Sequence, residues 1–202
     1  MPKRVDHDLR RAQIIDSLVR CAAREGLHAI TMRAVAAEAG VSLRLVQYYF
    51  QSKSQMMQAA LESLESQSVA QWAERITASA SSSARARLEA FLAAALPTDE
   101  QSRTHHLLWT SYAVLSMTDT AMAEQPFIDG PNLRERELAQ LLRNAIDDGE
   151  LPVDRDPDIE AGRLLTLSHG LGTSVLVGQR TITTAQRILQ YHLDQMFASP
   201  AL

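Results

Sequence analysis

Cysteine is almost absent from this sequence, and aromatic residues and long apolar segments are scarce. The 202 residues include one cysteine, Cys21, and aromatic residues make up 5% of the chain. A single thiol can form neither an internal disulfide nor an all-cysteine metal site, which fits a reducing compartment. No apolar run approaches the roughly 20 residues that span a bilayer, and the N-terminus lacks the apolar segment of a secretory signal. We therefore expect a cytoplasmic protein with no membrane partner.

Sequence motifs of common enzymes are missing as well. The chain has no Gly-rich phosphate loop and no serine or cysteine nucleophile in a recognisable motif. His105 and His106 are adjacent. They therefore point to different sides of a helix and do not form the i, i+4 pair that binds zinc. We expect a protein that is not an enzyme and that has no metal or other cofactor.

The charge is distributed unevenly along the chain. Hydrophobic residues make up 46% of the sequence, enough for a packed core, and the net charge is −4. Residues 1–53 hold nine basic and five acidic side chains, a net +4, whereas residues 54–202 hold eleven and nineteen, a net −8. A basic N-terminal end on an acidic remainder indicates a surface that binds a polyanion, although a modest asymmetry of this kind also arises by chance.

Apolar residues recur at helical spacing along most of the chain, and no segment has the alternation of a convincing strand. Residues 1–9 are polar and are expected to be frayed. Ser/Thr-x-x-Gln capping boxes are expected to start helices at Ser52, Thr98 and Thr183, and Asp156-Pro157 to start another. The sequence predicts an all-α protein whose nine helices cover about residues 9–25, 31–39, 42–50, 52–78, 84–96, 98–117, 132–148, 156–177 and 183–197.

The most informative stretch is residues 31–53, TMRAVAAEAGVSLRLVQYYFQSK. Thr31 is the expected N-cap of a first short helix, Gly40 ends that helix, and Ser42 is the expected N-cap of a second. Two short helices joined by a Gly-containing turn are typical of a helix-turn-helix. With the preceding helix they would form a three-helix head, residues 1–53, attached to a body of residues 54–202.

The second short helix carries polar groups suited to DNA. Helical spacing divides this helix into two sides. The inward side can hold Val41, Leu45, Val46, Tyr49 and Phe50, and the outward side then holds Leu43, Arg44, Gln47 and Tyr48. Arginine and glutamine can bind base edges in the major groove, and a phenol can contact phosphate. An ordinary solvated face is the alternative. Three consecutive aromatic residues at 48–50 cannot all face one core, so at least one is expected at the surface.

This stretch resembles the TetR family of bacterial transcriptional regulators. The resemblance rests on Thr31, Val35, Ala36, Ala39, Gly40, Val41, Ser42, Val46, Tyr48, Tyr49, Phe50, Ser52, Lys53, Met56 and Met57. It implies a nine-helix TetR-like architecture, with a helix-turn-helix head on a larger ligand-binding and dimerisation body. By resemblance, phosphate contacts fall to Thr31, Tyr48 and Lys53, and groove-facing positions to Ser42, Leu43, Arg44 and Gln47. Gln47 stands where the family often has tyrosine, so the resemblance does not give the operator sequence.

The resemblance also implies a small-molecule pocket in the body and a homodimer formed through residues 156–177 and 183–197. The first of these segments is apolar nearly all round, so it must be buried on more than one side. Aromatic and histidine side chains suit a small-molecule site, although such residues are more often plain core. The candidates for lining the pocket are Trp72, His105, Trp109, Tyr112, Met117 and His169.

The resulting hypothesis is a ligand-responsive transcriptional regulator, of the repressor type, that binds a palindromic double-stranded DNA operator as a homodimer and is released by an unknown small-molecule effector. One alternative is an all-α small-molecule-binding protein or enzyme whose head does not bind DNA. Another is a DNA-binding regulator without a ligand. The effector, the operator and the regulated genes cannot be read from the sequence.

Overall fold

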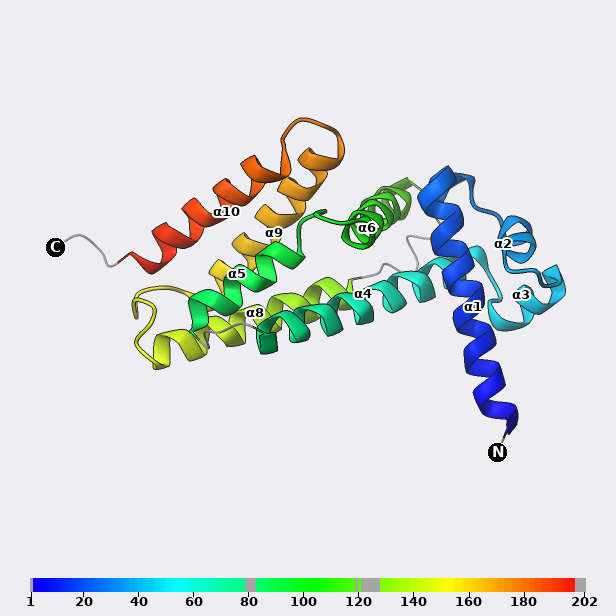
Figure 1. The fold of residues 1–202 in the computed structure, drawn as a ribbon, viewed down its shortest axis with the longest axis horizontal. Coiled ribbons are helices and arrows are strands. Elements are labelled where there is room, and N and C mark those ends of the chain that lie inside the picture. Colours follow the sequence, from blue (N-terminus) through cyan, green and yellow to red (C-terminus); the bar gives the residue numbers. More distant parts are fainter. Residues whose placement is uncertain (1, 79–82, 119, 121–127, 199–202) are drawn as a thin grey trace. The chain divides into compact units, whose positions relative to one another are not determined.

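The computed structural model describes residues 2–78, 83–118, 120 and 128–198. In these ranges the chain forms nine α-helices and one 3-10 helix, with no strand, so the all-α prediction is confirmed (Figure 1). The elements are α1 Pro2–Glu25, η1 Leu27–Ala29, α2 Met32–Glu38, α3 Leu43–Tyr49, α4 Lys53–Ala78, α5 Ala84–Ala94, α6 Glu100–Thr118, α8 Asp129–Asp147, α9 Pro157–Leu176 and α10 Ile182–Phe197. None of the described helices has both the length and the apolar composition of a membrane span.

The chain divides into two compact units. Unit 1 comprises Met1–Ser66 and Leu107–Phe127, and unit 2 comprises Gln67–His106 and Ile128–Leu202. The helices α4 and α6 therefore each contribute residues to both units. The predicted division between residues 53 and 54 is one of function, with DNA binding before it and ligand binding after it. It stays a prediction.

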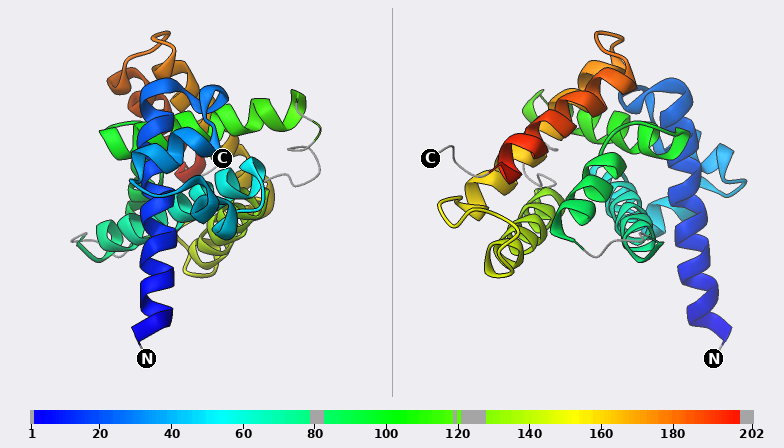
Figure 2. Two further views of the ribbon diagram at one scale, coloured as in Figure 1. Left: turned by 90° about the vertical axis from the view of Figure 1, so that its right-hand side faces the viewer. Right: turned by 60° about the vertical axis from the view of Figure 1, so that its left-hand side comes forward.

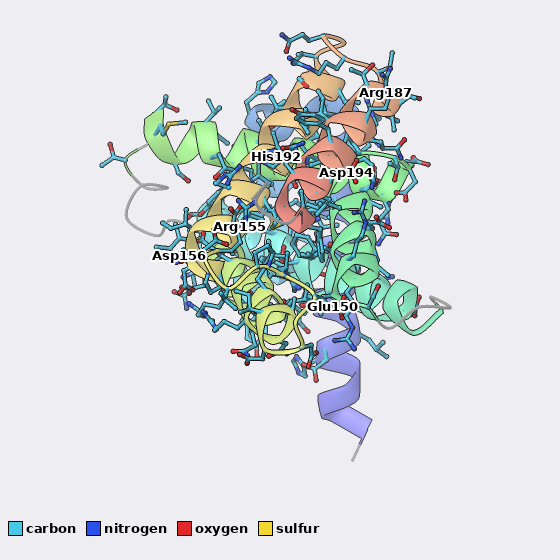
Figure 3. The ribbon with its side chains drawn as sticks, turned by 90° about the vertical axis from the view of Figure 1, so that its left-hand side faces the viewer. Glu150, Arg155, Asp156, Arg187, His192 and Asp194 are labelled. Atoms are coloured by element: carbon cyan, nitrogen blue, oxygen red, sulfur yellow. The ribbon has the colours of Figure 1, made fainter. Side chains whose placement is uncertain are left out.

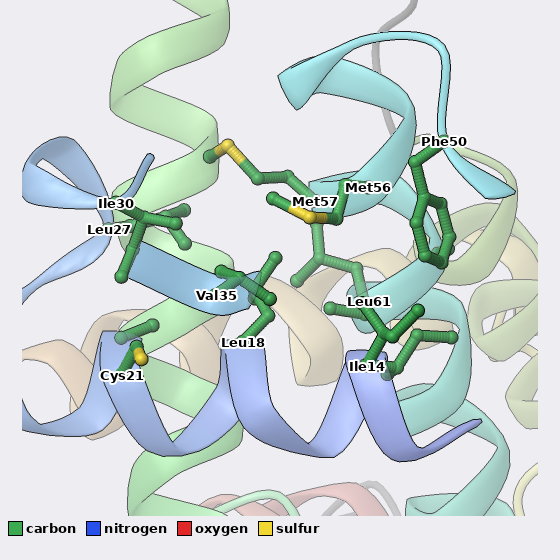
Figure 4. Close-up of a cluster of buried hydrophobic side chains, with 14 of the residues drawn as sticks. Ile14, Leu18, Cys21, Leu27, Ile30, Val35, Phe50, Met56, Met57 and Leu61 are labelled. Carbon is green, nitrogen blue, oxygen red and sulfur yellow. The ribbon is translucent and has the colours of Figure 1, made fainter. Parts of the chain in front are cut away.

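Unit 1 is built on a single hydrophobic core. Ile14 and Leu18 of α1 point toward Val35 of α2 and Leu61 of α4 (Figure 4). Cys21 lies in the same core, and burial raises the pKa of its thiol. A buried thiol with a raised pKa is unreactive, so Cys21 serves as a small apolar residue.

Unit 2 has its own core, formed where α5, α8, α9 and α10 pack together. Leucines dominate it, including Leu88, Leu138 and Leu164, each at most 1% exposed. α10 folds back along α9 (Figures 1 and 2). Among the labelled residues of this unit, Arg187, His192 and Asp194 lie on α10 (Figure 3).

Helix α1 begins earlier than predicted. It starts at Pro2 rather than near residue 9, so the expectation of a frayed N-terminus is wrong. Proline fits the first turn of a helix because that turn needs no amide donor, and no glycine or second proline interrupts the segment that follows.

Two of the three capping-box predictions misplace the cap. At Ser52 the prediction is confirmed, because its hydroxyl accepts a hydrogen bond from the Gln55 amide at 3.1 Å. The cap of α6 is Asp99 and not Thr98, since the Asp99 carboxylate accepts from the Ser102 amide at 2.8 Å. The cap of α10 is Thr181 and not Thr183. Short polar residues cluster before both helices, and the sequence pattern alone does not choose among them.

The correction at α10 leads to a test of stability. Thr181→Ala is expected to lower the free energy of unfolding by about 1 kcal/mol, because it removes the side-chain acceptor that satisfies an orphan amide. That acceptor lies 3.1 Å from the Thr184 amide. Thr183→Ala is the matched control, and we expect it to change stability by less than about 0.5 kcal/mol. Urea denaturation of both variants measures the difference, and equal losses would contradict the assignment of the cap.

Candidate nucleic-acid interface

The two short helices of the predicted helix-turn-helix are capped as expected. The Thr31 hydroxyl accepts from the Ala34 amide at 3.1 Å, and the Ser42 hydroxyl accepts from the Leu45 amide at 3.2 Å. Gly40 ends α2 with a φ of +65°, a conformation that side-chain-bearing residues rarely adopt. These local signals fix the start of each helix and the turn between them.

The faces of α3 separate apolar from polar residues. Val46 is fully buried and Phe50 is 2% exposed, whereas Tyr48 is 69% exposed. Arg44 and Gln47 are also exposed. The prediction that the aromatic run at 48–50 must present a side chain at the surface is therefore confirmed. The exposed face offers a guanidinium, an amide and a phenol side by side, which together can bind base edges and phosphates.

Leu43 differs from its predicted orientation. It is half-buried and packs against the core of unit 1, so only part of its side chain is presented outward. Leu45, which was expected to face inward, is half-buried without joining that core. Leu43 is the first residue of α3 and directly follows the loop after α2. From that position its side chain packs back against the core.

The remaining predicted contacts lie at helix starts. Thr31 and Ser42 are exposed at the N-termini of α2 and α3, where free amides favour an anion. Lys53 is half-buried at the first position of α4, and its Nζ lies 3.5 Å from the carbonyl oxygen of His28. That hydrogen bond is long, so the ammonium can exchange it for a phosphate at little cost.

An ion-pair cluster between α1 and α2 was not found by sequence reasoning. Arg20 and Arg24 of α1 both bond to the carboxylate of Glu38 on α2, at 3.0 and 3.3 Å. Hydrogen bonds from the two arginines lower the pKa of Glu38. The cluster is exposed, so its contribution to stability is small. Nothing in the spacing of these residues indicates their contact, because it depends on how α2 crosses α1.

The predicted pocket residues are not brought together as one described site. Tyr112 is buried in the core of unit 1, where burial raises its pKa, and Trp109 packs against the same core. Met117 is 76% exposed near the end of α6, and its contact with a ligand stays a prediction. Its position on the helix turns it away from the side that carries Tyr112. The side chain of Trp72 lies outside the described residues.

His105 and His169 belong to unit 2, together with a buried histidine that the sequence analysis did not select. His106 is 8% exposed, and its Nε2 lies 3.2 Å from the carbonyl oxygen of His169. Because a carbonyl oxygen can only accept, Nε2 carries the hydrogen and donates a hydrogen bond to the carbonyl oxygen. The ring lies against Gly172 of α9, where a Cβ would come within 2.1 Å of it. A glycine at 172 is thus the condition for this contact between α6 and α9.

The buried imidazole predicts that stability depends on pH. Burial lowers the pKa of His106, and the nearby His105 lowers it further, against the opposing effect of the hydrogen bond to His169. The unfolded chain therefore binds a proton at a higher pH than the folded chain. Stability from this group is complete above the ordinary histidine pKa of about 6.5 and is lost as the pH falls from there through the lowered pKa, by at most about 1.4 kcal/mol per pH unit.

Urea denaturation between pH 8 and pH 5 measures this loss. The pKa of His192 is also lowered, by burial and by the charge of Arg163, so it contributes with the same sign. We expect His106→Gln to flatten the pH dependence and His192→Gln to flatten it less, because His192 is only half-buried. A pH dependence that His106→Gln leaves unchanged would contradict the assignment.

A shallow groove of about 230 Å³ lies between α5 and α10 of unit 2. Its lining is mainly leucine, with polar side chains from Glu89, Gln186 and Gln190. Among the predicted pocket residues whose side chains the structure describes, none lines this groove.

Taken together, these features define a class of protein. A capped helix-turn-helix that exposes Arg44, Gln47 and Tyr48, followed by a separate unit of longer helices, is the arrangement of a DNA-binding transcriptional regulator.

Comparison with known proteins agrees with this class. Residues 14–60 match the profile described as bacterial regulatory proteins, tetR family, and residues 84–198 match that of the BetI-type transcriptional repressor, C-terminal. The chain belongs to the TetR family of bacterial transcriptional regulators. The predicted resemblance, and with it the nine-helix TetR-like architecture, is confirmed.

Relatives at low identity span nearly the whole chain. The HTH-type transcriptional regulator BetI of Escherichia coli (strain K12 / DH10B) is 26% identical over 198 residues, covering 96% of this chain and 97% of the relative. PksA of Bacillus subtilis (strain 168) is 25% identical over 205 residues, covering 97% and 94%.

Solved structures show the same fold. A TetR-family regulator from Rhodococcus sp. superposes with a TM-score of 0.83 at 23% identity, covering 94% of this chain and 98% of that one. A transcriptional regulator from Saccharomonospora viridis, solved in complex with choline, has a TM-score of 0.79 at 25% identity, covering 91% and 95%. The protein is a transcriptional regulator, and its residues 84–198 are of the BetI-type repressor class.

Proposed function

We propose that this regulator binds a palindromic operator as a homodimer and leaves it when a small organic effector occupies the body. The observation that carries the proposal is the face of α3, where Arg44, Gln47 and Tyr48 are exposed together next to two capped helix starts. In this assignment Arg44 and Gln47 contact bases in the major groove. Tyr48, Lys53 and Thr31 hold the sugar-phosphate backbone, and Ser42 and the exposed part of Leu43 face the groove.

Exposed side chains on α9 and α10 support the homodimer. Ile159 and Tyr191 are 62% and 65% exposed, although both are large and apolar or amphipathic. Gly170 is exposed on α9, and nothing lies within 4 Å of the position of an added Cβ. A glycine in a helix interior costs about 1 kcal/mol of helix propensity, which close approach of a helix from a second subunit offsets. A two-fold dimer also matches the symmetry of a palindromic operator.

The effector is proposed to contact the body, residues 54–202, and its candidate contacts are considered within each unit. Trp109 and Tyr112 supply aromatic surface in unit 1, and His105 and His169 supply imidazole groups in unit 2; both kinds of group suit a small-molecule site. Choline is the first compound to test, because the regulator from Saccharomonospora viridis was solved with choline bound. Aromatic faces bind quaternary ammonium groups through cation–π attraction.

The test uses a DNA duplex enriched from a random pool by the purified protein. Light scattering of the complex gives its stoichiometry, for which we expect two chains per duplex. Fluorescence anisotropy of the labelled duplex then measures its release across a panel of metabolites that includes choline. A complex of one chain per duplex would contradict the dimer. If no compound in the panel either releases the duplex or raises the melting temperature, the constitutive alternative is favoured over an effector.

A further inference from the structure

The N-terminal part of α1 extends beyond the hydrophobic core of unit 1. The buried face of α1 begins at Ile14, and every described side chain from His7 to Gln13 is exposed. At 1.5 Å per residue, the helix preceding Ile14 is about 18 Å long. An exposed helical segment of this length is marginal without tertiary contacts, so its position depends on the few contacts that it makes.

The contacts described between this segment and other elements are with the aromatic run at residues 48–50. The Tyr49 hydroxyl and Nδ1 of His7 are 2.9 Å apart and share a hydrogen bond. The His7 ring lies 5.8 Å from the Tyr49 ring and 6.2 Å from the Tyr48 ring, measured between centroids. One helical turn further along α1, the guanidinium carbon of Arg11 lies 5.3 Å from the centroid of the Phe50 ring. The N-terminal segment of α1 is therefore held against the C-terminal end of α3 by one hydrogen bond and by ring contacts.

Tyr48 is the residue for which this attachment has a functional consequence. Its ring meets the Tyr49 ring edge-on, at 5.3 Å and an interplanar angle of 81°, while most of its surface faces solvent. Immobilising a freely rotating side chain on binding costs about 0.5–1.5 kcal/mol. A Tyr48 ring that already lies beside the His7 and Tyr49 rings avoids part of that cost when its hydroxyl binds a phosphate.

We propose that His7 is a positioning residue for DNA binding, which fixes Tyr49 by a hydrogen bond and, through ring contacts, orients the Tyr48 phenol toward the sugar-phosphate backbone. This inference rests on the proposed DNA-binding function and adds to it a residue outside the helix-turn-helix. His7 is not assigned a contact with DNA. Its action passes through Tyr49 and Tyr48, and both of these residues lie on the helix that enters the groove.

The test is a set of variants titrated against the duplex enriched by the wild-type protein. We expect His7→Ala and Tyr49→Phe each to weaken binding about five- to tenfold, and the double variant to weaken it no more than the stronger single change, because both remove one interaction. His7→Gln retains a hydrogen-bonding group and is expected to restore part of the affinity. In a Tyr48→Ala background, His7→Ala is expected to have no further effect.

Two readouts separate this role from others. The salt dependence of binding is expected to stay unchanged in His7→Ala, because a phenol contact displaces no counterion. The melting temperature is also expected to stay close to that of the wild type, because His7 is exposed. Undiminished affinity in His7→Ala, additive losses in the double variant, or a reduced salt dependence would each overturn the proposal. Failure of the wild-type protein to enrich any duplex would instead overturn the proposed function itself.

Discussion

Gly172→Ala is expected to lower the free energy of unfolding by about 1–3 kcal/mol, although alanine is the better helix former by about 1 kcal/mol. The added methyl carbon would lie 2.1, 2.4 and 2.7 Å from three atoms of the His106 ring. The His106 ring must then move away from the surface of α9. In doing so it loses the hydrogen bond to the His169 carbonyl, which leaves a buried polar group unsatisfied.

The control for this variant is the same substitution in a background without the imidazole. In His106→Ala, the alanine at 172 meets no ring, and only the gain in helix propensity remains. Gly172→Ala is therefore expected to stabilise His106→Ala by up to about 1 kcal/mol, which reverses the sign of its effect. Urea denaturation at one fixed protein concentration measures all four proteins. Destabilisation of the same size in both backgrounds would show that Gly172 is required by something other than His106.

Combined replacement of Arg44 and Lys53 by alanine is expected to weaken operator binding by at least about 100-fold. Loss of a base-contacting arginine costs about 1–3 kcal/mol, and loss of a phosphate-contacting lysine weakens binding to all sequences. In a homodimer both losses occur twice. The slope of log affinity against log salt concentration is expected to fall by about 1 for each phosphate-contacting lysine removed.

The matched control removes two positive charges from elsewhere on the chain. Arg103→Ala with Arg136→Ala changes the net charge equally, and both side chains are exposed on α6 and α8. We expect this control to retain affinity within about threefold, because neither arginine belongs to the helix-turn-helix that is proposed to contact the DNA. If the two double variants weaken binding equally, the effect is one of overall charge, and the assignment of Arg44 and Lys53 is wrong.

The head could be predicted in detail because its signals are local. Thr31, Gly40 and Ser42 act within three or four residues of their own positions, as caps and a turn, and the exposure of Tyr48 follows from helical spacing. The misplaced caps at Thr98 and Thr183 show the limit of such signals. Where Asp99 or Thr181 stands nearby with equal capping chemistry, packing of the whole helix decides which residue is used.

Contacts between distant parts of the chain could not be predicted. The spacing of His106 in the sequence predicts no partner for it, and only the packing of its ring against α9 shows that it requires Gly172. The same holds for Glu38 with Arg20 and for His7 with Tyr49. Each of these pairs depends on how two helices cross. The sequence of one helix does not indicate which residue of the other it contacts. Ligand-lining residues are harder still, because Trp109 and Tyr112 have the same pattern whether they form core or a pocket.

Selection of bound duplexes from a random DNA pool tests the central claim most directly. A homodimer that presents two copies of α3 is predicted to enrich a palindrome whose half-sites are centred about 34–36 Å apart, one helical turn, or a multiple of that distance. The Arg44→Ala, Lys53→Ala protein is predicted to enrich nothing under the same conditions. Absence of any enriched sequence with the wild-type protein, or a non-palindromic sequence bound by a single chain, would contradict the account of a dimeric operator-binding regulator.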